Sequence, residues 1–185
     1  MVRFWRLALK LAGWITVGRL PENEKKFIII VAPHTSNWDF IMGVIIRGAM
    51  GFKANFLGKE SLFRKPFGFI FMGLGGIPVD RGTSRNMVDQ VVAEINGRSS
   101  FILAIAPEGT RGKVKKWRTG FYYIARNANI PIVMCQLDYK HKEARFLDPF
   151  YPTGNVNADL EYIHDQFKDV KGLNDLKTGN LEDIL

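Results

Sequence analysis

A histidine and an aspartate five residues apart form the first pair in this sequence whose types and spacing suit catalysis. His34 and Asp39 lie in the stretch Val31-Ala-Pro-His-Thr-Ser-Asn-Trp-Asp39. Two residues five apart do not share one face of a continuous helix, but a turn between them brings their side chains together. An aspartate that accepts from one imidazole nitrogen fixes the tautomer and leaves the other nitrogen as a general base. The pair therefore predicts acid–base chemistry, unless His34 is an ordinary loop residue beside a helix-capping aspartate.

The residues around this pair predict a strand followed by a helix. Phe27 to Val31 is an unbroken apolar run, typical of a strand buried on both faces, and Pro33 ends it because proline has no N–H for a sheet. A buried helix is expected from Trp38 onward, with Ser36 or Asn37 as its cap. The catalytic pair would then flank a strand-to-helix turn, which is where α/β sheets place their ligand crevices.

Strand and helix patterns alternate along the rest of the chain. Residues 67–79 carry no charge and are expected to form a buried helix, a glycine turn and a strand at 77–79. The other expected strands are 54–57, 101–106, 130–137 and 144–147, and the other expected helices are 60–64, 83–96, 119–129 and 158–170. The 185 residues, of which 46% are hydrophobic and 24% charged, suffice for one folded domain. The alternation predicts a single-domain α/β fold with a largely parallel β-sheet flanked by helices.

Three of the predicted strands are followed by polar residues suited to one site. The His34 pair follows the first, Arg81 follows another, and Glu108-Gly-Thr-Arg111 follows a third. The carboxyl ends of parallel strands meet at one edge of a sheet, so these groups are expected to share a crevice. Two arginines suit phosphate oxygens, and Gly109 lets backbone approach a ligand closely. The set predicts an enzyme that deprotonates a hydroxyl on a phosphorylated substrate.

Residues 1–20 are predicted to form an N-terminal amphipathic helix. Its basic residues Arg3, Arg6 and Lys10 stand among Phe4, Trp5, Leu7, Leu11, Trp14 and Ile15. The charges interrupt the apolar run, which argues against both a signal peptide and a membrane span. A basic, tryptophan-bearing helix suits the membrane interface, while the alternative is a helix packed on the domain with its basic side in water.

The net charge of +8 indicates an acidic partner. Nucleic acid, an anionic membrane and a phosphorylated cosubstrate all fit the charge, and residues 111–118 alone carry five basic side chains. No recognisable nucleic-acid-binding motif is present, so no nucleic-acid partner is expected. One cysteine excludes an internal disulfide and fits a reducing compartment, and three histidines with one cysteine make a closed zinc site implausible.

Four motifs in order give the sequence a resemblance to a known family. His34-Thr-Ser-Asn-Trp-Asp39 resembles the His-x-Ser-x-x-Asp core of motif one of the glycerolipid, or lysophospholipid, acyltransferase superfamily, of the 1-acylglycerol-3-phosphate acyltransferase type. Gly75-Gly-Ile-Pro-Val-Asp-Arg81 resembles motif two, Pro107-Glu-Gly-Thr-Arg111 motif three, and Ile130-Pro-Ile-Val133 motif four. Each motif alone is weak, but four in the family's order are a strong signal.

The resemblance implies transfer of a fatty acyl group from acyl-CoA or acyl-carrier protein to the hydroxyl of a lysophospholipid or glycerol-phosphate-type acceptor, in phospholipid biosynthesis. His34 would be the general base and Asp39 would orient it. The implied acceptor and phosphate site is Ser36, Arg81, Glu108, Gly109, Thr110 and Arg111. The attack is direct, with no acyl-enzyme, metal or other cofactor. No Gly-x-Ser-x-Gly elbow is present, so Ser36 is expected to hydrogen-bond the turn rather than act as a nucleophile.

The N-terminal helix and the basic charge, taken with the resemblance, predict where the protein works. Residues 21–185 would be the acyltransferase domain, bound peripherally to the cytoplasmic face of an anionic membrane through residues 1–20 and the basic surface. Pro33, Pro78 and Ala106 depart from the family's usual residues and reshape the pocket wall, which leaves the acceptor open. A thioesterase or esterase, or a catalytically silent lipid-binding protein of the same fold, are the alternatives. The acyl chain length, the donor and the oligomeric state are not fixed by the sequence.

Overall fold

The computed structural model describes residues 1–79 and 84–174, and its strands form one mostly parallel sheet. The strands are β1 (Ile15–Val17), β2 (Lys26–Ala32), β3 (Asn55–Lys59), β4 (Gly76–Val79), β5 (Phe101–Ile105), β6 (Ile132–Asp138) and β7 (Glu143–Phe146). Across the sheet they run in the order β1-β7-β6-β2-β5-β3-β4. Only the β6–β7 pairing is antiparallel among these strands. The predicted α/β fold with a largely parallel sheet is confirmed.

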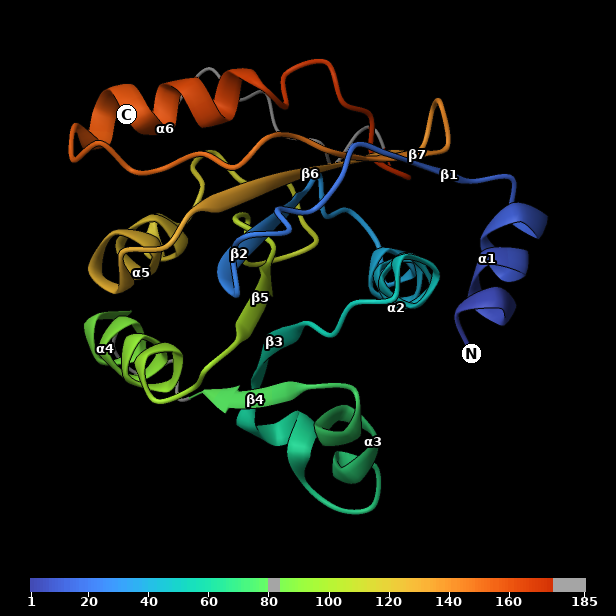
Figure 1. Ribbon diagram of the computed structural model, residues 1–185, viewed down its shortest axis with the longest axis horizontal. Coiled ribbons are helices and arrows are strands. Elements are labelled where there is room, and N and C mark those ends of the chain that lie inside the picture. The colour runs from blue at the N-terminus through green and yellow to red at the C-terminus, as the bar shows by residue number, and fades with distance from the viewer. Residues whose placement is uncertain (80–83, 175–185) are drawn as a thin grey trace.

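Helices cover both faces of this sheet. They are α1 (Val2–Leu11), α2 (Trp38–Met50), α3 (Gly68–Gly73), α4 (Ser84–Asn96), α5 (Gly120–Ala128) and α6 (Val156–Asp165), with a short 3-10 helix at Glu60–Phe63. Helices α1 and α2 lie on one side and α4, α5 and α6 lie on the other, while α3 lies beyond β4 at the end of the sheet (Figure 1). The central strand β2 is therefore buried on both faces, with Ile28, Ile29 and Ile30 at its middle, as its unbroken apolar run predicts.

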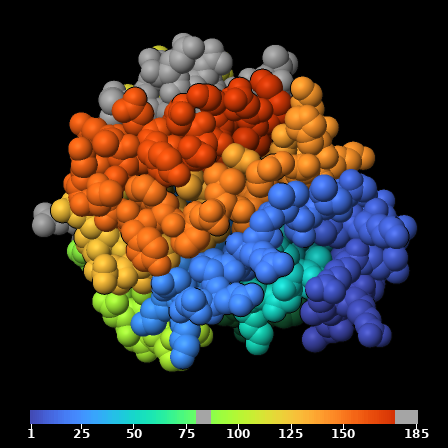
Figure 2. Space-filling view, turned by 45° about the horizontal axis from the view of Figure 1, so that its top comes forward, coloured from blue at the N-terminus to red at the C-terminus, as the bar shows by residue number. Residues whose placement is uncertain are grey.

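The N-terminal segment contributes a strand as well as a helix. Helix α1 ends at Leu11, short of residue 20, and Gly13 turns the chain with a φ of +73°. Strand β1 follows and pairs in parallel with β7, with Ile15 opposite Glu143. Figure 2 shows the N-terminal residues in blue against the orange segment that contains β7. Residues 15–17 therefore form a strand at one edge of the sheet.

Helix α3 is exposed, and the expectation of a buried helix in 67–79 was wrong. Of its residues only Gly68 is buried, while Phe69, Ile70 and Met72 are exposed. The reason is its place in the fold: α3 leads into β4, the last strand of the described sheet, beyond which no further strand covers it. An uncharged sequence indicates low polarity but does not say whether another layer lies over it.

No helix within the described residues is long and apolar enough to cross a bilayer.

Candidate active site

The turn between β2 and α2 brings the predicted catalytic pair together. Strand β2 ends at Ala32, Pro33 follows, and α2 begins at Trp38. Nδ1 of His34 lies 3.0 Å from Oδ2 of Asp39, and the two side chains are 25% and 2% exposed. A carboxylate can only accept, so Nδ1 carries the proton and Nε2 is the nitrogen able to take one from a substrate.

The backbone of the same turn fixes the aspartate. Oδ2 of Asp39 also accepts the N–H groups of Thr35, at 2.7 Å, and of Ser36, at 2.8 Å. The Ser36 hydroxyl accepts the N–H of Trp38 at 3.2 Å, within the turn. Three donors on one oxygen hold the carboxylate in place, so the imidazole is oriented before any substrate arrives.

Tyr139 completes the set of donors to Asp39. It follows β6, and its hydroxyl donates to Oδ1 of Asp39 at 2.7 Å, while its ring packs edge-on against Trp14 with centroids 4.8 Å apart. Burial alone would raise the pKa of Asp39, but hydrogen bonds from His34, Tyr139 and Ser36 outweigh it and hold that pKa below its ordinary value. Burial and the bond to Asp39 raise the pKa of Tyr139, so it stays a donor. The carboxylate is therefore charged at neutral pH.

The chain beyond α6 returns to the catalytic turn. Asn174 donates through its backbone N–H to Oγ1 of Thr35 at 3.2 Å and through Nδ2 to the Thr35 carbonyl at 3.1 Å. Gly172 is buried, and a Cβ there would lie 2.7 Å from the Thr35 side chain. The carbonyl of Lys171 accepts the N–H of Tyr139 at 2.9 Å. Residues 171–174 thus hold the turn and Tyr139 together.

Sequence reasoning missed these supporting residues. Tyr139 is 100 positions from Asp39, and Asn174 is 139 positions from Thr35. No spacing rule connects positions so far apart, and neither residue belongs to one of the four motifs. Only the order of the strands, which places β6 beside β2, indicates that the end of β6 lies near His34.

Glu108 supports the turn from a buried position. It follows β5, and its Oε1 accepts the N–H of His34 at 2.9 Å. Burial raises the pKa of Glu108 despite that hydrogen bond. Its Oε2 is buried without a hydrogen-bond partner within the described residues. The structure thus joins Glu108 to the backbone of the catalytic histidine.

The remaining predicted acceptor residues lie on the exposed loop after Glu108. Gly109, Thr110 and Arg111 are all exposed. Gly109 has a φ of +65°, and a Cβ there would lie 2.7 Å from the Arg118 side chain, so this position favours glycine. Arg81, the second predicted phosphate ligand, lies outside the described residues. The structure therefore shows an oriented His34 joined to Glu108, and the roles predicted for Gly109, Thr110, Arg111 and Arg81 stay predictions.

The sequence matches one protein family over most of its sheet. A family model described as Acyltransferase matches residues 16–137, about two thirds of the chain. The chain belongs to the acyltransferase family. All four motifs fall inside the matched stretch, so the resemblance predicted from them is confirmed at the level of the family.

A solved structure supports the fold of this acyltransferase. The crystal structure of the 1-acyl-sn-glycerophosphate (LPA) acyltransferase PlsC from Thermotoga maritima superposes with a TM-score of 0.62. The two are 20% identical in sequence, and the match covers 90% of this chain and 75% of that one. At this identity the likeness shows the shared fold. No curated protein matches the chain in sequence.

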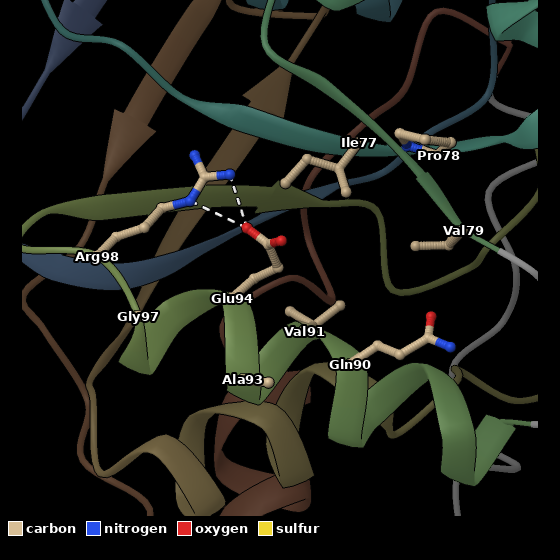
Figure 3. A pocket seen from close by; sticks show the side chains of 9 residues that line it. All are labelled: Ile77, Pro78, Val79, Gln90, Val91, Ala93, Glu94, Gly97 and Arg98. Carbon is tan, nitrogen blue, oxygen red and sulfur yellow. Dashed lines mark hydrogen bonds and ion pairs between the residues drawn. The ribbon is translucent and has the colours of Figure 1, made fainter.

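A hollow of the acyltransferase lies apart from the His34–Asp39 pair. It is formed between β4 and α4, and Figure 3 shows Arg98 and Glu94 in its lining, joined by hydrogen bonds of 3.0 and 2.6 Å. None of its lining residues is among the predicted site residues. The described residues also hold no group of three or more His, Cys, Asp or Glu side chains placed to bind a metal.

Proposed function

We propose that this acyltransferase moves a fatty acyl group from acyl-CoA or acyl-carrier protein to the hydroxyl of a lysophospholipid or glycerol-phosphate-type acceptor, as a step of phospholipid biosynthesis. One observation carries the proposal: the 3.0 Å hydrogen bond by which Asp39 orients His34. The solved acyltransferase of the same fold acts on a lysophospholipid, which supports a lipid acceptor.

The proposed reaction is a direct transfer. Nε2 of His34 takes the proton of the acceptor hydroxyl while that oxygen attacks the thioester carbonyl. A C–O bond forms, the C–S bond breaks, and the leaving thiolate takes the proton from the imidazolium. Asp39 stabilises the imidazolium during the transfer, because its carboxylate is charged and hydrogen-bonded to Nδ1. This sequence of steps needs no acyl-enzyme, metal or other cofactor.

We infer that basic side chains attract the phosphate groups of the acceptor and of the CoA donor. Arg111 is exposed on the loop that follows Glu108, and Arg81 is the second arginine that the motifs assign to the acceptor phosphate. The exposed side chains of Lys113, Lys115 and Arg118 extend the positive charge along the same loop. We infer that this loop attracts the phosphates of CoA or the acidic surface of a carrier protein.

We further propose that α1 docks the enzyme peripherally on the cytoplasmic face of an anionic membrane. Helix α1 packs on α2 through the buried Leu9 and through the Trp5 ring, which lies against Gly48. Its residues Phe4 and Leu7 remain exposed one turn apart. Helix α1 therefore packs on the domain through one face and exposes apolar side chains on another, and this exposed face suits the membrane interface.

Liposome sedimentation tests this docking. Phe4→Ser with Leu7→Ser should reduce sedimentation with anionic vesicles, since these side chains are exposed, and the variant keeps the buried Leu9. Binding equal to that of the wild type would refute the docking proposal.

The acyl-transfer proposal is tested by direct product analysis. Purified protein is incubated with a radiolabelled acyl-CoA or acyl-carrier thioester and a panel of lysophospholipids. The wild type should yield acylated acceptor, and His34→Ala should be slower by roughly 10²- to 10⁴-fold. His141→Ala is the matched control, because His141 is paired with Asp138 at 2.7 Å but exposed on the surface.

Two results would contradict the proposal. Free fatty acid in place of acylated acceptor would establish a thioesterase. Acylated acceptor formed equally by wild type and His34→Ala would remove the general base from the mechanism.

A further inference from the structure

A short apolar surface surrounds α3 on the outside of the molecule. Its large exposed hydrophobic residues, here called the α3 patch, are Leu62, Phe67, Phe69, Ile70 and Met72. The rings of Phe67 and Phe69 are the most exposed of these, at 64% and 68%. Isolated exposed hydrophobic residues are common, but five within eleven positions of one segment indicate an interaction surface.

The α3 patch is continuous with the apolar start of α2. Phe71 of α3 contacts Phe40 of α2, with ring centroids 6.4 Å apart. Trp38 and Ile41, on either side of Phe40 in α2, are also exposed. Since Asp39 lies in the same first turn of α2, the apolar surface extends from α3 to the catalytic turn.

Charges around the patch identify the chemistry of its partner. Between residues 53 and 79 the sequence has four basic residues, Lys53, Lys59, Arg64 and Lys65, and one acidic residue, Glu60. Arg64 and Glu60 are 4.0 Å apart and both largely exposed, so this pair is weak. Protruding aromatic rings with a basic surround are suited to an anionic bilayer, in which the rings enter the acyl boundary and the cations contact the headgroups.

We propose that the α3 patch inserts into the surface of an anionic phospholipid bilayer. It forms a second membrane contact separate from α1, and the two are linked through α2, which packs on α1 and contacts α3 through Phe40 and Phe71. The proposed bilayer contact does not depend on the proposed acyl-transfer reaction. Its consequence, that the start of α2 and the catalytic turn face the membrane holding the acceptor, rests on the proposed function.

Vesicle binding tests the patch by substitution. Phe67→Ser with Phe69→Ser should weaken binding to phosphatidylglycerol-containing vesicles by roughly tenfold or more. Tyr162→Ser on α6 is the matched control, because Tyr162 is 50% exposed on the other side of the sheet. Equal binding by the double variant and the wild type would overturn the proposal. Circular dichroism checks that both variants fold.

A single-site probe then reports insertion directly. The chain's one cysteine, Cys135, is buried and burial raises the pKa of its thiol to about 12, so an introduced cysteine can be labelled selectively. An environment-sensitive fluorophore at Phe69→Cys should shift to the blue on adding anionic vesicles, while one at Tyr162→Cys should not. No shift at position 69, or the same shift at both positions, would overturn insertion of α3.

Sedimentation velocity addresses the competing occupant, a second copy of the chain. A wild-type dimer that dissociates on Phe67→Ser with Phe69→Ser would overturn the membrane proposal, and a monomer in both proteins supports it. None of these measurements depends on turnover. They can therefore fail while the acyl-transfer assay succeeds, and the reverse also holds.

Discussion

Replacing Asp39 by asparagine separates the charge of this residue from its shape. The amide oxygen can occupy the Oδ2 position and accept the N–H groups of Thr35 and Ser36, which lie 2.7 and 2.8 Å from that atom in the wild type. The amide NH₂ then faces the hydroxyl of Tyr139, whose oxygen can accept. The turn should therefore keep its structure, and the variant loses only the negative charge beside His34.

The cost of that loss follows from the geometry. Nδ1 and Oδ2 are 3.0 Å apart, so an imidazolium and a carboxylate attract each other by about 5 kcal/mol at an effective dielectric constant of about 20. Solvent reaches the His34 side chain, which is 25% exposed, and reduces this value. We expect Asp39→Asn to lower kcat by roughly 10²- to 10⁴-fold. KM should change little, because Asp39 is buried and does not line the substrate surface.

The release of free CoA thiol from acyl-CoA can be followed with a thiol reagent, and its dependence on substrate concentration gives kcat and KM. Asp138→Asn is the control, because Asp138 holds the exposed His141 at 2.7 Å in the same manner, and it should leave kcat unchanged. A folded Asp39→Asn protein with kcat close to that of the wild type would refute the reasoning. Thermal unfolding of both variants establishes that they are folded.

Three further predictions follow from the groups around this pair. Tyr139→Phe removes one donor from the Asp39 carboxylate and should lower kcat roughly tenfold in the same assay. Asn174→Ala removes both hydrogen bonds to Thr35 and should lower kcat roughly three- to tenfold with little change in KM, because the catalytic turn is held less firmly. Glu108→Gln should raise Tm by roughly 2–4 °C at neutral pH. Burial raises the pKa of Glu108, so the protonated carboxyl stabilises the folded state fully below the ordinary pKa of 4.5. This stabilisation is lost as pH rises through the folded-state pKa. The higher Tm of Glu108→Gln should therefore vanish near about pH 4, where the glutamate is also neutral.

The two kinetic predictions have control variants, and each of the three predictions has a contrary result. Tyr123→Phe, at an exposed tyrosine of α5, and Leu173→Ala, beside Asn174, should leave kcat unchanged. Wild-type kcat in Tyr139→Phe or in Asn174→Ala would show that the residue replaced has a structural role only. A Glu108→Gln protein less stable than the wild type at neutral pH would contradict the assigned cost of the buried carboxylate.

The sequence predicted the elements that carry local signals. The apolar run at Phe27 to Val31 gave a strand buried on both faces, observed as β2, and the pattern from Trp38 onward gave the helix observed as α2. The pairing of His34 with Asp39 was also predictable, because a short turn limits how far apart two side chains five positions apart can lie. Motif order was enough to indicate the family, which the family model confirms.

Exposure was less predictable than secondary structure. The uncharged residues 67–79 indicated a helix and a strand correctly, but the helix is exposed at the edge of the sheet. Hydrophobicity is a property of each residue, whereas burial depends on which other layer of the fold lies over it.

By itself, then, the sequence determined the α/β class and the His34–Asp39 pair, since both follow from local patterns: the alternation of strands and helices along the chain, and a spacing of five residues across a short turn. Only the tertiary structure decided what holds that pair in place. It brings Tyr139 to the free oxygen of Asp39 and Asn174 to Thr35, across 100 and 139 positions. The first contact follows from the order of strands in the sheet, with β6 beside β2, and the second from the path of the chain beyond α6. Strand order is fixed by the packing of the whole domain, which no local pattern of residues encodes.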